Sequence, residues 1–81
     1  MWHTFPQWSS VAAAELSFSQ DTCLRAHTGG ILCREQRVPG GFQFAWKIPG
    51  EASLLECCPE MDRQHALLGA CRELDERMQW S

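Results

Sequence analysis

Cysteine and histidine are the residues of this sequence that could do chemistry. Five cysteines and three histidines occur among its 81 residues. Zinc binds thiolate and imidazole ligands, two of which usually sit close together in a Cys-x-x-Cys pattern. That pattern is absent, so only the fold could assemble a zinc site, and we expect no bound cofactor. If zinc is bound, the weak candidate ligands are Cys23, His27, Cys57, Cys58, His65 and Cys71.

The cysteines also allow two other interpretations. A free cysteine usually behaves as a small buried hydrophobic residue, and Cys71 lies on an apolar helix face. A disulfide framework is the other interpretation, but the odd count and the irregular spacing count against it. We therefore expect mainly buried thiols, with a module stabilised by zinc or disulfides as the alternative.

Cys58 precedes Pro59, a residue suited to the first position of a helix. A cysteine at a helix N-terminus has a lowered pKa, which favours the reactive thiolate. If exposed there, Cys58 would be the most reactive sulfur of the chain. A simple helix boundary explains the Cys-Pro pair equally well.

The pattern does not favour catalysis. A cysteine nucleophile needs a nearby base and an orienting group, and the three histidines are isolated in the sequence. Gly29-Gly30 and Gly40-Gly41 lack the surrounding residues of a phosphate-binding loop. We expect a protein that is not an enzyme.

An aromatic N-terminal arm, residues 1–10, is the predicted partner-binding segment; the alternative is that it folds back onto the sheet. It carries Trp2, Phe5 and Trp8, and aromatic side chains dominate binding energy at protein interfaces. A net charge of −3 without a basic stripe argues against nucleic acid. No apolar run approaches the roughly 20 residues that cross a bilayer. The expected partner is therefore a protein, of unknown identity.

The clearest local signal is a β-hairpin. Pro39-Gly40 suits the centre of a type II turn, and Phe42, Phe44, Trp46 and Ile48 then alternate with mostly polar residues. An alternation that repeats every two residues indicates a strand with one apolar face. We predict that 31–38 pairs with 42–48, and that 14–19 forms another strand. A short helix that starts after Ser10 is the alternative for that segment. Residues 20–30 are predicted to form a turn or loop.

An amphipathic helix is predicted over 59–79, starting at Pro59. A short helical turn is expected before it, because Ser53 and Glu56 fit a capping box. One face of the long helix carries an apolar stripe, which we expect to pack on the aromatic side of the hairpin. The stripe consists of Leu67, Ala70, Cys71, Leu74 and Met78.

These elements predict an α+β fold: a small antiparallel hairpin or three-stranded sheet followed by one C-terminal amphipathic helix, within a single domain of residues 11–81. We expect a small non-catalytic protein-interaction module that acts through its aromatic arm or helix face. If the monomer leaves Leu67, Leu74 and Met78 uncovered, the helix could also pair with a second helix. No targeting segment is apparent, which predicts a cytoplasmic or nuclear location. The chain has no Asn or Tyr and a single Lys, so a young or non-standard reading frame without a selected role is a further alternative.

Overall fold

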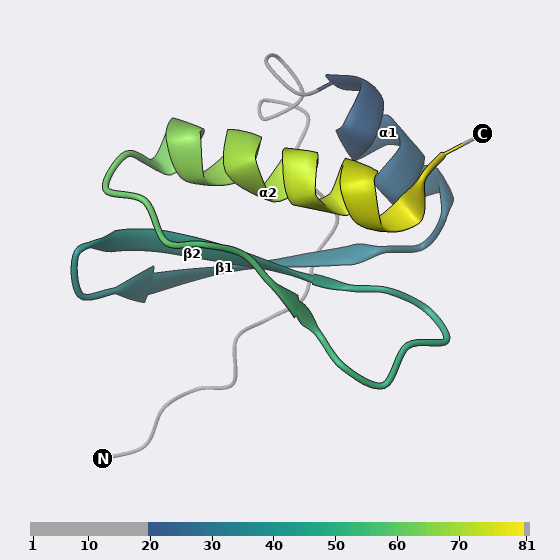
Figure 1. The fold of residues 1–81 in the computed structure, drawn as a ribbon, viewed down its shortest axis with the longest axis horizontal. Helices are drawn as coiled ribbons and strands as arrows, with labels where there is room; N and C mark the ends of the chain where they lie inside the picture. The colour runs from purple at the N-terminus through teal and green to yellow at the C-terminus, as the bar shows by residue number, and fades with distance from the viewer. Residues whose placement is uncertain (1–19, 81) are drawn as a thin grey trace.

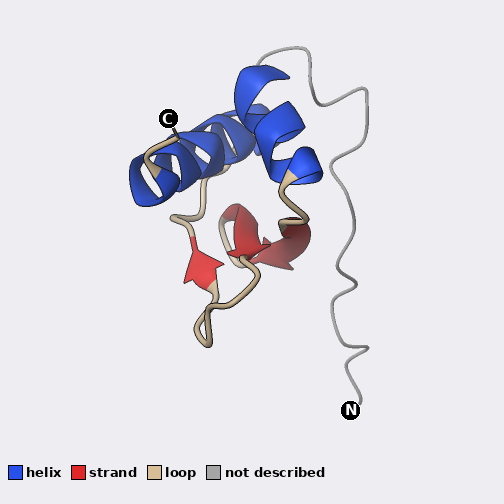
Figure 2. Ribbon diagram, turned by 90° about the vertical axis from the view of Figure 1, so that its right-hand side faces the viewer, coloured by secondary structure: helices blue, strands red, loops and turns tan. Residues whose placement is uncertain are grey.

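The computed structural model describes residues 20–80, which form two helices and a three-stranded sheet. The elements in chain order are α1 (Gln20–Thr28), β1 (Leu32–Val38), β2 (Gly41–Lys47), β3 (Leu55–Glu56) and α2 (Arg63–Met78). The strands are antiparallel, in the order β1-β2-β3. Both helices lie on the same side of the sheet (Figures 1 and 2). The α+β class is confirmed. The arm 1–10 and the predicted strand 14–19 lie outside the described residues.

The predicted hairpin is present as β1 and β2. Its register sets Val38 opposite Gly41 and Cys33 opposite Trp46. Gly40 has φ 91°, the left-handed conformation that a type II turn requires at its second central residue. Gly41 is needed for a different reason: a Cβ atom there would lie 2.1 Å from the carbonyl oxygen of Glu60.

The predicted helical turn at Ser53–Glu56 is wrong. Leu55 and Glu56 form β3 instead and pair with Trp46 and Ala45 of β2. The backbone groups on this side of β2 need hydrogen-bond partners in the folded chain. That long-range pairing outweighs the local capping preference of Ser53.

The start of α2 also differs from the prediction. Glu60 remains extended beside β2: its backbone N–H donates to the carbonyl of Phe42 at 2.9 Å, and it accepts the N–H of Phe42 at 2.8 Å. The helix therefore begins at Arg63 rather than at Pro59. Asp62 is the N-cap, and its carboxylate accepts the backbone N–H of Gln64 at 2.8 Å.

The prediction of a turn or loop over 20–30 is wrong, because most of this segment is α1. Its C-terminus forms a Schellman motif: the N–H of Ile31 donates to the carbonyl of Ala26, and that of Gly30 to the carbonyl of His27. Gly30 has φ 74°, the left-handed conformation that the motif needs. The glycine pair therefore ends a helix instead of marking a loop.

The apolar stripe of α2 packs on β2, as predicted. Leu67, Leu74 and Trp46 are each fully buried, and Phe44 is almost so. The indole Nε1 of Trp46 donates to the backbone carbonyl of Ala70 at 3.0 Å. Burying an aliphatic or aromatic side chain of this size stabilises a fold by about 1.5–3 kcal/mol. This packing fixes α2 over the sheet and so positions the surfaces described below.

Candidate functional site

Two cysteine sulfurs meet where α1 packs against α2. Cys23 and Cys71 are 48 positions apart in the sequence, and their Sγ atoms are 3.9 Å apart. Both side chains are buried, at 0% and 2% exposure. The sequence pattern named both as candidate ligands without pairing them, because it assigned Cys23 to a loop. Formation of α1 brings the two thiols together.

A polar contact beside this sulfur pair ties α1 to the end of α2. The hydroxyl of Thr22 donates to the carboxylate of Asp75 and lies 2.8 Å from each of its oxygens. The indole Nε1 of Trp80 donates to the same carboxylate at 2.6 Å. The guanidinium of Arg25 lies 5.9 Å from the centroid of the Trp80 ring. Sequence reasoning missed this contact. The spacing of Cys23 and Ala26 before the glycine pair was the available signal for α1.

Three of the buried thiols, Cys23, Cys33 and Cys57, are held in their protonated form. Burial, with a further contribution from Cys71, raises the pKa of Cys23 from 9.0 to about 12. Burial raises the pKa of Cys33 and of Cys57 to about 12 as well; neighbouring thiols add to the shift of Cys33, and Glu73 adds to that of Cys57. The thiolate is the nucleophile and the metal ligand. At neutral pH these three sulfurs are therefore poor nucleophiles.

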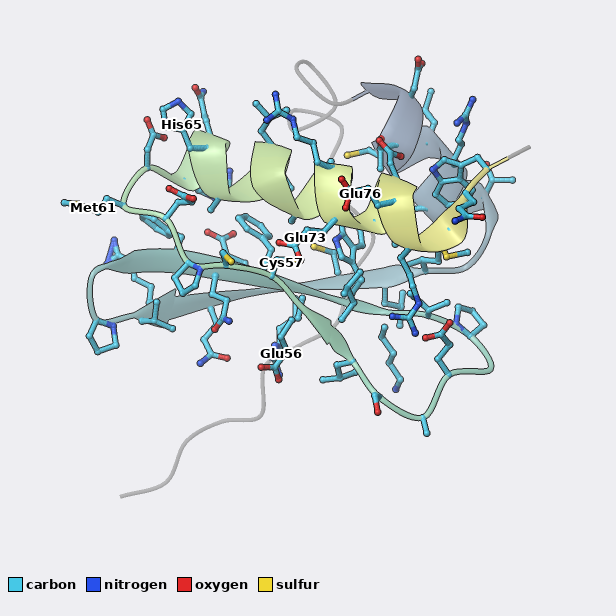
Figure 3. All side chains as sticks on the ribbon, in the orientation of Figure 1. Glu56, Cys57, Met61, His65, Glu73 and Glu76 are labelled. Atoms are coloured by element: carbon cyan, nitrogen blue, oxygen red, sulfur yellow. The ribbon has the colours of Figure 1, made fainter. Side chains whose placement is uncertain are left out.

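The other candidate ligands are spread over the surface. His27 on α1, Cys58 and His65 are all exposed. His65 lies on the outside of α2 near its first turn, whereas Cys57 lies between α2 and the sheet (Figure 3). Nδ1 of His65 is 3.9 Å from the carboxylate of Asp62. Within residues 20–80, no three His, Cys, Asp or Glu side chains are grouped as a metal ion would require.

Cys58 does not cap a helix. Because α2 begins at Arg63, the positive end of its dipole lies beyond Cys58, and the predicted activation by a helix N-terminus is wrong. The backbone N–H of Cys58 instead donates to the carboxylate of Glu73 at 3.3 Å. Its side chain is exposed, unlike those of the other four cysteines. Cys58 is thus the accessible thiol of the chain.

The outer edge of β1 is defined here by the backbone of Cys33, Glu35 and Arg37. In an antiparallel pair, successive residues direct their N–H and C=O groups alternately toward and away from the partner strand. In β2, the backbone groups of Phe42 and Phe44 form hydrogen bonds on the side of β3, away from β1. The residues opposite them in β1, Arg37 and Glu35, must therefore point away from β2. No strand among residues 20–80 pairs with this edge.

The side chains along β1 carry a mixed charge pattern. Glu35 accepts two hydrogen bonds from Arg63, at 2.7 and 2.9 Å. The guanidinium of Arg37 lies 4.9 Å from the Phe42 ring centroid. Arg34 reaches across β2 toward Glu56 at 3.7 Å on the other face of the sheet, and Glu56 points away from α2 (Figure 3). Acidic and basic groups thus alternate along a strand with an open edge.

The two partner-binding predictions fare differently. Trp2, Phe5 and Trp8 lie outside the described residues, so the aromatic arm stays a prediction. On the predicted helix face, Leu67 and Leu74 are fully buried against the sheet and Met78 is partly buried. This stripe is occupied by contacts within the fold.

In the described part of the chain, no helix is both long and apolar enough to cross a membrane.

No protein-family model, curated protein or solved structure matches the sequence or the fold. The geometry of residues 20–80 is therefore what supports the proposals below.

Proposed function

We propose that this chain is a small non-catalytic protein-interaction module that associates through the outer edge of β1. The observation that carries the proposal is the outward direction of the backbone groups of Cys33, Glu35 and Arg37. A strand edge with available N–H and C=O groups accepts a further strand through main-chain hydrogen bonds. Side chains at alternate positions then select the added strand.

A second copy of the chain is the occupant that the charges of β1 favour. If two β1 strands run antiparallel with Gln36 opposite Gln36, Glu35 of each copy lies opposite Arg37 of the other. This register uses the outward backbone groups of both residues. Two identical ion pairs result, as a twofold symmetric interface requires. Opposite charges directly across an antiparallel pair contribute about 0.2–1 kcal/mol each.

Sedimentation equilibrium on the full chain tests the proposal. We expect a reversible monomer–dimer equilibrium in the wild-type protein. Glu35→Arg and Arg37→Glu should each weaken it by about tenfold, because each change sets like charges opposite each other twice. An equimolar mixture of the two variants should restore association, since every facing pair in the mixed dimer is again opposite in charge.

Two controls separate this edge from other surfaces. A Trp2→Ala, Trp8→Ala double variant should dimerise like the wild type, and loss of its association would assign the interface to the arm. Hydrogen exchange should protect the amides of Glu35 and Arg37 only at concentrations where dimer forms. A wild-type chain that remains monomeric, or that protects these amides as a monomer, would overturn the proposal. Circular dichroism of each variant confirms that it is folded.

A further inference from the structure

We infer that Cys23 and Cys71 form an intramolecular disulfide when the protein meets a low-molecular-weight disulfide such as oxidised glutathione, so that α1 becomes covalently joined to α2. This inference is independent of the proposed edge interaction. It depends on the contact between the two sulfurs, which are already 3.9 Å apart in the reduced protein. A disulfide requires about 2 Å between them.

The surrounding structure favours a disulfide between Cys23 and Cys71 over one between the sequence neighbours Cys57 and Cys58. The sulfur of Cys57 is directed to the backbone carbonyl of Leu55, at 3.8 Å. Cys58 is its neighbour in sequence but is exposed, whereas Cys57 is buried. Cys23 and Cys71 belong to two separate helices in contact. A disulfide between them requires the two sulfurs to approach by about 2 Å, and neither residue takes part in the strand pairing of the sheet.

The exchange proceeds in two balanced steps. The Cys23 thiolate attacks one sulfur of oxidised glutathione, which forms a mixed disulfide and releases one glutathione thiolate. The Cys71 thiolate then attacks the Cys23 sulfur, which forms the protein disulfide and releases the second glutathione. Two protons pass from the protein thiols through solvent to the released thiolates. Two electrons pass from the protein to glutathione.

Access to Cys23 sets the rate of the reaction. The thiol is fully buried, and its raised pKa keeps it protonated while α1 is docked. A helix at the margin of a fold opens locally more easily than the core does. Undocking of α1 from Asp75 exposes Cys23, and redocking returns it to Cys71. The disulfide then closes a long loop and stabilises the protein by restricting the unfolded chain.

Peptide mapping of the oxidised full chain tests the inference. Trypsin cleaves after Arg25, Arg34, Lys47, Arg63 and Arg72, which separates Cys23, Cys33 and Cys71 into different peptides. Folded protein is incubated with oxidised glutathione, its remaining thiols are alkylated, and the digest is analysed by mass spectrometry. We expect a crosslink between the Cys23 and Cys71 peptides that is two hydrogen atoms lighter than the two free peptides, and a raised midpoint of thermal unfolding.

Two variants complete the test. Cys58→Ala should give the same crosslink and the same rise in the midpoint. Cys71→Ala should remove both. A dominant crosslink between any other pair would overturn the inference. So would free thiols at both Cys23 and Cys71 in the wild-type chain, under conditions where the unfolded chain forms disulfides. Neither result depends on the stability of a variant, because both are read from the wild-type protein.

Discussion

The indole Nε1 of Trp46 lies 3.0 Å from the backbone carbonyl of Ala70, in the interior between β2 and α2. This bond joins the central strand to the middle of the long helix. It also satisfies the one polar atom of the largest fully buried side chain of the described core. The contact fixes the position of α2 along β2, whereas the surrounding apolar contacts are less directional.

Trp46→Phe should lower the free energy of unfolding by about 2–3 kcal/mol, because it removes a buried hydrogen bond and leaves a cavity. Urea denaturation followed by circular dichroism measures the change. Met61→Ala is the control: Met61 is 83% exposed, so its replacement should cost little. Equal losses in the two variants would contradict the central place of Trp46.

Gly41→Ala should lower the free energy of unfolding by about 2 kcal/mol or more. The new Cβ would meet the backbone of Glu60 at 2.1 Å, and φ at this position is 147°. Gly69→Ala in α2 is the matched control. A Cβ there meets nothing within 4 Å, so it should stabilise the helix by about 0.5–1 kcal/mol. Thermal melts of the two variants should therefore shift in opposite directions.

Thr22→Val should loosen α1 and leave the sheet intact. The change removes the hydroxyl that donates to Asp75, and a lost hydrogen bond to a charged group costs about 1.5–3 kcal/mol. Hydrogen exchange should accelerate in α1 while the amides that join β1 to β2 keep their protection. Uniform acceleration across both regions would show that α1 and the sheet open as one unit.

The free energy of unfolding should fall in alkaline solution. Burial raises the pKa of Cys23, Cys33 and Cys57 from 9.0 to about 12. Between these values the unfolded chain releases thiol protons that the folded chain retains, so unfolding becomes more favourable as the pH rises. Each thiol contributes at most about 1.4 kcal/mol per pH unit. Below pH 9 these three thiols should not change the free energy of unfolding.

Urea titrations from pH 7 to pH 11 measure this dependence. Cys57→Ala should show a shallower decline than the wild type, because one of the contributing thiols is gone. Cys58→Ala should retain the full decline that the three buried thiols produce. A wild-type stability that is constant across this range would contradict the protonated, buried state of the sulfurs.

One thiol should react with iodoacetamide far faster than the others. Cys58 is exposed, and the other four cysteines are buried. Mass spectrometry of the native protein over time should show one rapid modification followed by slow ones, and Cys58→Ala should remove only the rapid phase. Rapid modification at several sites would contradict the packing around α1 and β2.

Periodicity in the sequence was enough to predict the hairpin and the apolar stripe of α2. Both depend on neighbours along the chain: Pro39-Gly40 sets the turn, and residues from Phe42 to Trp46 alternate. The stripe of α2 follows the helical repeat, which is why its packing on β2 was predicted correctly. These signals need no knowledge of distant residues.

Tertiary contacts decided the rest. Glu60 stays extended because it pairs with Phe42, which moves the start of α2 to Arg63 and away from Cys58. Leu55 and Glu56 become a strand because β2 offers them backbone partners. The glycine pair after α1 was visible in the sequence, but a short helix with few apolar residues is defined only by the surface on which it docks. Cys23 and Cys71, 48 residues apart, meet for the same reason: long-range packing selects among local conformations that the chain alone leaves nearly equal in energy.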